Sequence, residues 1–207
     1  MAGPGGAAAV IGNQPIAYGV PGPDSESSVV LDMALSVVAG SKIIQAGLRG
    51  DEIPEGWRVG RDGKWVTDPA IPGALAPGGG HKGYGLAVLI EIMSSVLTGG
   101  AVLGEIGFHR DTPDQPTRTG HWITAVAVES FMQLDDFRRR MASLRDEIHA
   151  TPTAQGIEHV MLPGEPDRRF EVEAERFGIP LEAVVWDPVH ELAVELGHAD
   201  ELDAARL

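Results

Sequence analysis

Residues 78–90 read Gly-Gly-Gly-His-Lys-Gly-Tyr-Gly-Leu-Ala-Val-Leu-Ile, a glycine-rich loop that continues directly into an apolar segment. We expect a helix over 84–97, with Lys82 at the junction of loop and helix. The first amides of a helix have no internal partner and carry partial positive charge, and glycines let a bound group approach the backbone closely. Two interpretations stay open: an anion site, with phosphate as the expected anion, or a tight turn with a close helix contact.

The same stretch satisfies the G-x-G-x-x-G pattern of dinucleotide-binding Rossmann units through Gly78, Gly80 and Gly83. That pattern requires a strand immediately before its first glycine. Residues 71–77 read Ile-Pro-Gly-Ala-Leu-Ala-Pro, and two prolines there exclude a central strand. A Walker A loop is excluded as well, because Lys82 is followed by glycine rather than by Ser or Thr.

The composition excludes several classes of function. The chain has 207 residues, a formal net charge of −14 and no cysteine. Without cysteine there are no disulfides, thiolate metal sites or thiol nucleophiles, and an acidic surface repels nucleic acid and anionic membranes. The most apolar run, 86–97, is interrupted by Glu91 and is too short to span a bilayer. We therefore expect a cytoplasmic protein with no nucleic-acid or membrane partner.

Hydrophobic periodicity and turn residues predict the order of the elements. We expect short strands over 7–11, 16–20, 29–31, 122–128 and 157–162, and helices over 36–48, 84–97, 135–149, 167–177 and 188–196. Arg61-Asp62-Gly63, between two short runs that contain Trp and Val, is typical of a hairpin turn. Strands that come mostly before helices indicate an α/β or α+β fold.

Single polar residues leave alternatives open. Asp32 stands near a predicted strand-to-helix junction, where it is a buried base, a ribose binder or, as its position favours, a helix cap. Glu165 follows Gly164 and is either an acceptor for a sugar hydroxyl or an exposed acid in a first helical turn. The seven histidines lack metal-binding spacing, so we predict no metal site; His81 borders Lys82 and the same expected anion.

Four segments together are similar to one known family. They read Gly-Asn-Gln-Pro at 12–15, Asp-Met-Ala-Leu-Ser at 32–36, Gly-Gly-His-Lys-Gly-Tyr-Gly-Leu at 79–86 and Leu-Pro-Gly-Glu at 162–165. In this order and spacing the chain resembles the malate/L-lactate dehydrogenase family, which includes ureidoglycolate and sulfolactate dehydrogenases. The resemblance runs over nearly the whole chain. It departs at Gln14, where the family usually has Asn.

The resemblance implies oxidation of a small 2-hydroxy acid with NAD or NADP, or the reverse reduction of a 2-oxo or cyclic imino acid. It implies a non-Rossmann α/β fold like that of sulfolactate dehydrogenase, and a homodimer. We expect a partial dinucleotide-binding domain over 1–134 and a C-terminal helical region over 135–207. Carried over from the family, the residues expected to contact the dinucleotide are Asp32, Met33, Ala34, Lys82, Gly164, Glu165 and Pro166.

The resemblance also implies a catalytic histidine in an S-x-H-x-G motif that lies before the matched part of the family. No histidine precedes His81, so we expect an incomplete chain that lacks its N-terminal part and holds no catalytic residue. The alternatives are a non-catalytic remnant that binds a dinucleotide or dimerises, and an unstable fragment with an exposed apolar surface. The choice between NAD and NADP stays open, since Arg168 and Arg169 are either partners for a 2′-phosphate or surface residues.

Overall fold

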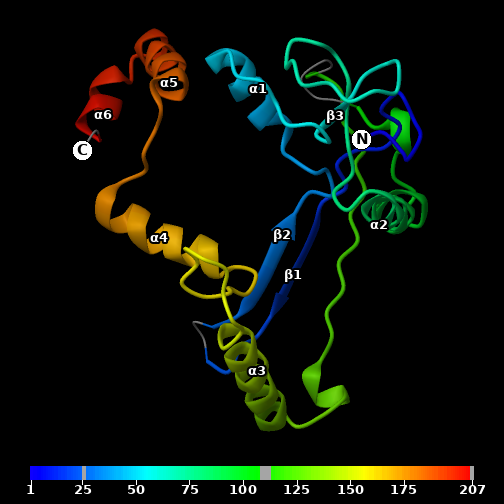
Figure 1. Ribbon diagram of the computed structural model, residues 1–207, viewed down its shortest axis with the longest axis vertical. Coiled ribbons are helices and arrows are strands. Elements are labelled where there is room, and N and C mark those ends of the chain that lie inside the picture. The colour runs from blue at the N-terminus through cyan, green and yellow to red at the C-terminus, as the bar shows by residue number, and fades with distance from the viewer. Residues whose placement is uncertain (25–26, 108–112, 206–207) are drawn as a thin grey trace. The chain divides into compact units, whose positions relative to one another are not determined.

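The computed structural model describes residues 1–24, 27–107 and 113–205 (Figure 1). The chain divides into two compact units. Unit 1 comprises Met1–Tyr18 and Asp32–Ser130, and unit 2 comprises Gly19–Leu31 and Phe131–Leu207. Strands β1 (Ile16–Val20) and β2 (Val29–Met33) pair in a two-stranded sheet, and each strand contributes residues to both units.

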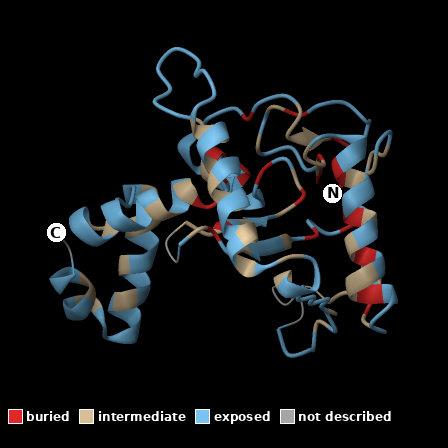
Figure 2. Ribbon diagram, turned by 90° about the horizontal axis from the view of Figure 1, so that it is seen from below, coloured by how far each residue is buried: buried red, intermediate tan, exposed pale blue. Residues whose placement is uncertain are grey.

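Unit 1 consists of short elements joined by long turns. In chain order they are α1 (Gly40–Arg49), β3 (Arg58–Val59), β4 (Ala74–Leu75), α2 (His81–Glu91), the π-helical turn η1 (Ile92–Val96), and the 3-10 turns η2 (Leu103–Glu105) and η3 (Val128–Ser130). Strands β3 and β4 pair antiparallel, with Arg58 opposite Leu75 and Val59 opposite Ala74. The π-helical turn continues α2 without a break, so the two form one rod (Figure 2).

The core of unit 1 lies under α2. Small or polar residues occupy the buried positions of this rod at every fourth residue, namely Gly83, Ala87, Glu91 and Ser95. They form one stripe along the helix (Figure 2). Ala87 is fully buried and packs with Met1, Ile11 and Leu35. A second cluster, Val38, Ile43, Ala46 and Ile53, anchors α1.

Unit 2 is helical apart from its share of the β1–β2 sheet. It contains α3 (Leu134–His149), α4 (Glu165–Phe177), α5 (Ala183–Leu196) and α6 (Ala199–Ala204). Large apolar side chains on these helices stay exposed, among them Phe170, Phe177 and Leu192. None of the residues described in these four helices is buried. The buried residues described in unit 2, among them Val29 and Leu162, lie outside the helices.

Several predicted elements are confirmed. Strands form at 16–20 and 29–33, and α3 begins one residue before the predicted 135. The predicted hairpin turn also forms: Val59 bridges Trp65, and Gly63 adopts a left-handed φ of 78°. The glycine-rich loop does continue into a helix, but α2 begins at His81 rather than at 84, so Lys82 lies inside the first turn.

Three predicted strands are wrong. Residues 7–11 contribute only an isolated bridge from Ala2 to Ala9, 122–127 and 157–162 are irregular, and Val128 begins η3. A β-branched run becomes a strand only where a neighbour completes its hydrogen-bond ladder, and no described strand pairs with these segments. Helix α1 begins at Gly40 rather than at 36, α5 begins before Pro188 rather than at it, and α6 was not predicted. The predicted domains over 1–134 and 135–207 stay a prediction.

No helix among the described residues is long and apolar enough to cross a membrane.

Candidate functional site

The start of α2 keeps two features of an anion site. Gly79 and Gly80 adopt left-handed φ angles of 70° and 61°, which turn the chain into the helix. In the first turn, the N–H groups of Lys82 and Tyr84 donate to the carbonyls of Gly79 and Gly80. Among the described residues, no carbonyl accepts the N–H groups of His81 and Gly83. Two free amides therefore flank Lys82, whose side chain is exposed and forms no ion pair with any described residue.

Gly83 accounts for the tightness of this turn. A Cβ atom at this position would lie 1.8 Å from the carbonyl oxygen of Gly78, well inside van der Waals contact. Only glycine allows the first helical turn to approach the loop this closely. The glycine-rich loop thus does form a tight turn with a close helix contact. It does not compete with the anion interpretation, because the close approach leaves the neighbouring amides free.

The loop before α2 is joined to the segment that follows Asp32-Met33-Ala34. The Gly78 N–H donates to the Leu35 carbonyl at 2.8 Å, and the Val37 N–H donates to the Ala76 carbonyl at 2.9 Å. The fold of unit 1 therefore connects the predicted cofactor segment at 32–34 with the loop that carries Lys82.

The helix-cap interpretation of Asp32 is wrong. Asp32 lies within β2 and is exposed, and the N-cap of α1 is Ala39. Met33, which ends β2, is 40% exposed, and Ala34 is half-buried. All three residues thus keep surface that a ligand can contact.

A cavity of about 510 Å³ opens beside the start of α2. Its lining includes His81, Val37, Trp65 and seven glycines, at positions 3, 5, 6, 56, 63, 79 and 80. A wall of glycines exposes backbone amides and carbonyls rather than side chains, which suits a polar ligand held by the main chain.

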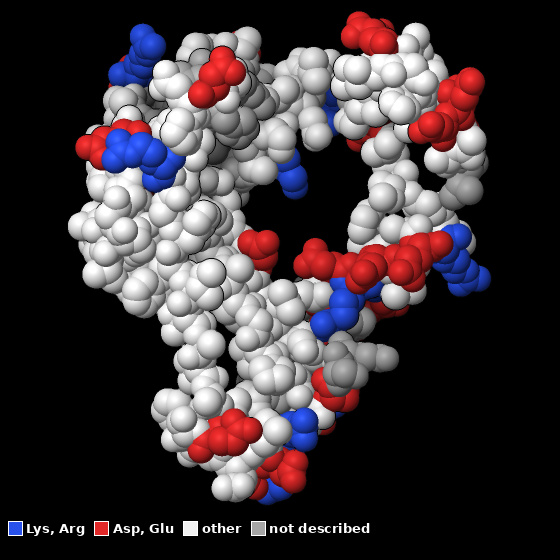
Figure 3. Space-filling view, turned by 180° about the vertical axis from the view of Figure 1, so that it is seen from behind, with Lys and Arg blue, Asp and Glu red and all other residues white. Residues whose placement is uncertain are grey.

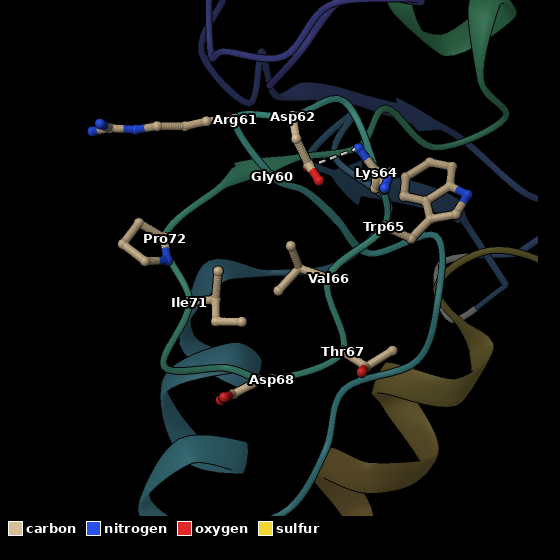
Figure 4. A pocket seen from close by; sticks show the side chains of 10 residues that line it. All are labelled: Gly60, Arg61, Asp62, Lys64, Trp65, Val66, Thr67, Asp68, Ile71 and Pro72. Atoms are coloured by element: carbon tan, nitrogen blue, oxygen red, sulfur yellow. Dashed lines mark hydrogen bonds between the residues drawn. The ribbon is translucent and has the colours of Figure 1, made fainter.

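A second cavity, of about 670 Å³, lies over the 60–72 loop (Figure 4). The Asp62 carboxylate in its lining stabilises the hairpin turn, because it accepts the backbone N–H of Lys64 at 3.1 Å. The Arg61 side chain extends away from the other labelled side chains. None of the predicted cofactor residues lines either cavity. The glycine-walled cavity differs in that Gly79, Gly80 and His81, at the start of α2, are part of its lining.

In unit 2, Gly164 and Glu165 start α4. Gly164 has a left-handed φ of 90° and is buried against Val30, whose carbonyl oxygen would lie 3.0 Å from an added Cβ. The Val30 N–H donates to the Pro163 carbonyl at 3.1 Å, so β2 holds this turn. Pro166 is exposed at the second position of the helix.

The Glu165 carboxylate is the most highly coordinated acid near the predicted residues. One oxygen accepts the Leu162 N–H at 2.7 Å, and the His149 Nε2 lies 3.0 Å from both oxygens. Burial raises the pKa of the Glu165 carboxyl, but the Leu162 hydrogen bond and the positive charges of His149 and Arg168 outweigh it, so the pKa lies below its ordinary value. The exposed-acid interpretation is wrong, since this side chain is 22% exposed.

The sequence analysis missed His149. It ends α3, where a basic side chain is favoured by the helix dipole, sixteen residues before Glu165. The position of His149 at a predicted helix end is the only indication in the sequence that it has a structural role. It does not indicate that Glu165 is its partner. Among the described residues, no three His, Asp or Glu side chains converge as they would around a metal ion.

The two arginines weighed as partners for a 2′-phosphate are both engaged. Arg168 donates to the Ser28 carbonyl at 2.8 Å, and Arg169 pairs with Glu158 and Glu173. Asp and Glu side chains form a row along α4 (Figure 3). The surroundings of Arg168 and Arg169 are therefore acidic, in contrast to the start of α2.

Comparison with known proteins gives the chain its relatives. The family model described as malate/L-lactate dehydrogenase matches residues 1–190. L-sulfolactate dehydrogenase of Methanocaldococcus jannaschii is 36% identical over 195 residues, which cover 93% of this chain and 55% of that protein. Ureidoglycolate dehydrogenase (NAD(+)) of Escherichia coli is 31% identical over 161 residues, which cover 78% of this chain and 46% of that protein.

The fold agrees with these relatives. A solved structure of sulfolactate dehydrogenase from Methanocaldococcus jannaschii matches with a TM-score of 0.72 at 33% identity, covering 95% of this chain and 56% of that one. The predicted likeness to the sulfolactate dehydrogenase fold is therefore confirmed. The chain spans about half the length of the curated relatives it matches. With most of its length matched by the family model and by relatives of this identity, the chain belongs to the malate/L-lactate dehydrogenase family of oxidoreductases.

Proposed function

We propose that this chain supplies the dinucleotide-binding residues of an NAD- or NADP-dependent dehydrogenase acting on a small 2-hydroxy acid or the matching 2-oxo acid. The names of the relatives support this substrate class, and one of them specifies NAD(+). The residues proposed to contact the dinucleotide are Asp32, Met33, Ala34 and Lys82 in unit 1, and Gly164, Glu165 and Pro166 in unit 2. A second copy of the chain is the proposed protein partner.

One observation carries the proposal: two free amides and an unpaired ammonium share the first turn of α2 among the described residues. A pyrophosphate matches this set, because its oxygens accept hydrogen bonds from the His81 and Gly83 N–H groups while Lys82 balances their charge. A dinucleotide held by these residues would supply an acceptor for the hydride of the hydroxy acid, or a hydride donor to the oxo acid.

Unit 2 contributes a different chemistry to the proposal. An ionised carboxylate only accepts hydrogen bonds, and its two oxygens offer about four lone-pair positions. Leu162 and His149 occupy part of that capacity at Glu165, and the lowered pKa keeps the group ionised at neutral pH. The remaining capacity suits a ribose hydroxyl.

The base that removes the hydroxyl proton is proposed to lie outside these 207 residues. General-base catalysis contributes about 10²–10⁴ in rate, so the purified chain should bind the dinucleotide yet turn over malate or lactate at no measurable rate. Steady oxidation of either acid by the chain alone would refute this part of the proposal. It would also refute the non-catalytic alternative.

The decisive experiment is titration of the purified chain with NADH, followed by the fluorescence of the nicotinamide. Lys82→Ala should raise the dissociation constant about 10- to 100-fold, because a charge-assisted contact contributes about 1.5–3 kcal/mol. The matched control is Lys64→Ala, another exposed lysine of unit 1, which lies on the 60–72 loop. It should leave the constant within twofold. Equal effects of the two variants would reduce Lys82 to general surface charge and remove the support for the site.

A further inference from the structure

Glu91 is a buried carboxylate that the proposed function leaves without a role. It ends α2, its exposed fraction is 4%, and no described residue forms an ion pair with it. One oxygen accepts the Leu103 N–H at 2.6 Å, and the other accepts the side-chain amide of Gln14. A buried charge is costly unless its lone pairs are satisfied, so this arrangement of two donors is what makes the carboxylate tolerable in the core.

Both donors belong to residues with an unusual backbone. Gln14 has a φ of 42° and Leu103 a φ of 49°, and they are two of only three described non-glycine residues in the left-handed region. For residues other than glycine, a backbone in this region costs about 1 kcal/mol or more. Such conformations persist where the surroundings over-determine them, and they cluster at functional sites. Glu91 accepts a hydrogen bond from each of them.

The helix itself changes at this point. From Ile92 onward the α-helical pattern gives way to the π-helical turn η1. The π-helical turn ends the rod, since turn residues follow it at 97–99. Glu91 is therefore the last α-helical residue, and it faces the core as part of the buried stripe of α2.

The Gln14 contact reaches the proposed cofactor segment through the backbone. The carbonyl of Asn13, the preceding residue, accepts the Leu35 N–H at 2.7 Å. The Leu35 carbonyl in turn accepts the Gly78 N–H at 2.8 Å. Leu35 directly follows Ala34, and Gly78 opens the loop that carries Lys82. Hydrogen bonds joined by short pieces of backbone thus connect Glu91 to both parts of the unit 1 site.

We propose that Glu91 is a positioning residue for dinucleotide binding: its carboxylate fixes the strained Gln14 loop, and this loop fixes the backbone of 32–35 and of the 78–82 loop. The inference rests on the proposed function, because it concerns the same cofactor residues. The inference requires that the side chain at position 91 accept hydrogen bonds from two N–H groups. A carboxylate does so, whereas an amide offers one acceptor and one donor.

The test uses the nearly isosteric variant Glu91→Gln and the exchanged pair Gln14→Glu with Glu91→Gln. In the single variant the Gln14 amide has to turn over for both hydrogen bonds to form, and both bonds lose the negative charge that strengthens them. We therefore expect the NADH dissociation constant to rise at least tenfold. In the exchanged pair the new glutamine accepts from Leu103 and donates to the new glutamate, so the constant should return to within threefold of the unaltered chain.

Melting temperatures of the same samples separate positioning from simple loss of stability. Ile53→Val serves as the matched control, because Ile53 is 2% exposed and belongs to the other core cluster of unit 1. If Ile53→Val lowers the melting temperature as much as Glu91→Gln and weakens NADH binding equally, the positioning role is overturned. It is equally overturned if Glu91→Gln binds NADH within twofold of the unaltered chain.

The outcomes also distinguish this inference from the proposed function. Normal binding by Glu91→Gln together with weak binding by Lys82→Ala overturns the role of Glu91 and leaves the cofactor site standing. No NADH binding by the unaltered chain overturns both. Should Glu91→Gln not fold, the exchanged pair decides alone: native-like affinity supports the inference, and a folded pair that binds at least tenfold more weakly overturns it.

Discussion

Helices α2 and α4 both begin after a glycine with a left-handed φ, yet the charges and free hydrogen-bonding groups in their first turns are opposite. In the first turn of α2, two N–H groups are free of described acceptors, and the single charged side chain there is Lys82. In the first turn of α4, Pro166 removes one N–H, and the N–H groups of Glu165 and Arg168 donate to the backbone carbonyls of Leu162 and Gly164. Two acids, Glu165 and Asp167, occupy that turn.

This difference separates two kinds of ligand group. The positive end of a helix dipole attracts an anion only when no acid of the protein already occupies it. The start of α4 is already neutralised by its own carboxylates, and what it offers is an acceptor for hydroxyls. The start of α2 offers donors and a cation. A dinucleotide contains both phosphates and hydroxyls, which is why the proposed function includes both helix starts.

The largest expected effect comes from adding a side chain at the close contact between the glycine-rich loop and α2. Gly83→Ala places a methyl group 1.8 Å from the Gly78 carbonyl oxygen, so the loop and helix have to separate. We expect the free energy of unfolding to fall by about 3 kcal/mol, measured by urea titration, together with loss of NADH binding.

The control for this variant lies two residues further along the same helix. An added Cβ at Gly85 meets nothing within 4 Å, so Gly85→Ala should raise stability by up to about 1 kcal/mol through helix propensity. If Gly83→Ala were tolerated as well as Gly85→Ala, the close approach of loop and helix would not be what shapes the α2 start.

A smaller effect tests the acid at α4. Glu165→Gln removes the charge that accepts from Leu162 and His149, and we expect a loss of about 1–2 kcal/mol at pH 7. Because the pKa of Glu165 is lowered in the folded state, its stabilisation is full above the ordinary value of 4.5 and is lost as the pH falls through the folded pKa. The difference between the two unfolding curves should therefore shrink below about pH 4.

Glu173→Gln is the control for that measurement. Glu173 pairs with Arg169 on the same helix, but the side chains are 57% and 58% exposed. Exposed pairs contribute about 0.5 kcal/mol or less, so this variant should show almost no dependence of stability on pH. A Glu165→Gln difference that stays constant down to pH 2 would mean that the carboxylate charge does not stabilise the α4 start.

The two helix starts also show what the sequence permits one to predict. The α2 start is local: glycines, Lys82 and an apolar run are consecutive, and neighbouring residues decide both its turn and its free amides. The contacts of Glu165 depend on His149, sixteen residues away, and those of Glu91 on Gln14, 77 residues away. No periodicity encodes such pairs, because they follow from how the elements pack.

The same reasoning explains the predicted strand that failed at 122–128. Trp122, Ile123 and Val126 have the residue types of a strand, but their side chains are 52%, 91% and 68% exposed. Strand propensity describes how a residue fits a half-buried pleated surface, and this segment has no such surface among the described residues. Glycine, proline and helix periodicity were better guides because they act within one or two turns of chain.

The smallest expected effect on stability sharpens the comparison most, because it gives α2 the chemistry of α4. His81→Asp places an acid at the first position of α2, where His81 is exposed and lines the glycine-walled cavity. Interaction with the helix dipole should raise the free energy of unfolding by about 0.5 kcal/mol. The same carboxylate competes with a phosphate for the free amides and for Lys82, so NADH should bind more weakly. Stability and affinity should thus change in opposite directions, and His81→Asn, which adds no charge, should change neither by as much. A variant that gained stability without losing affinity would show that the amides of the α2 start do not hold the dinucleotide.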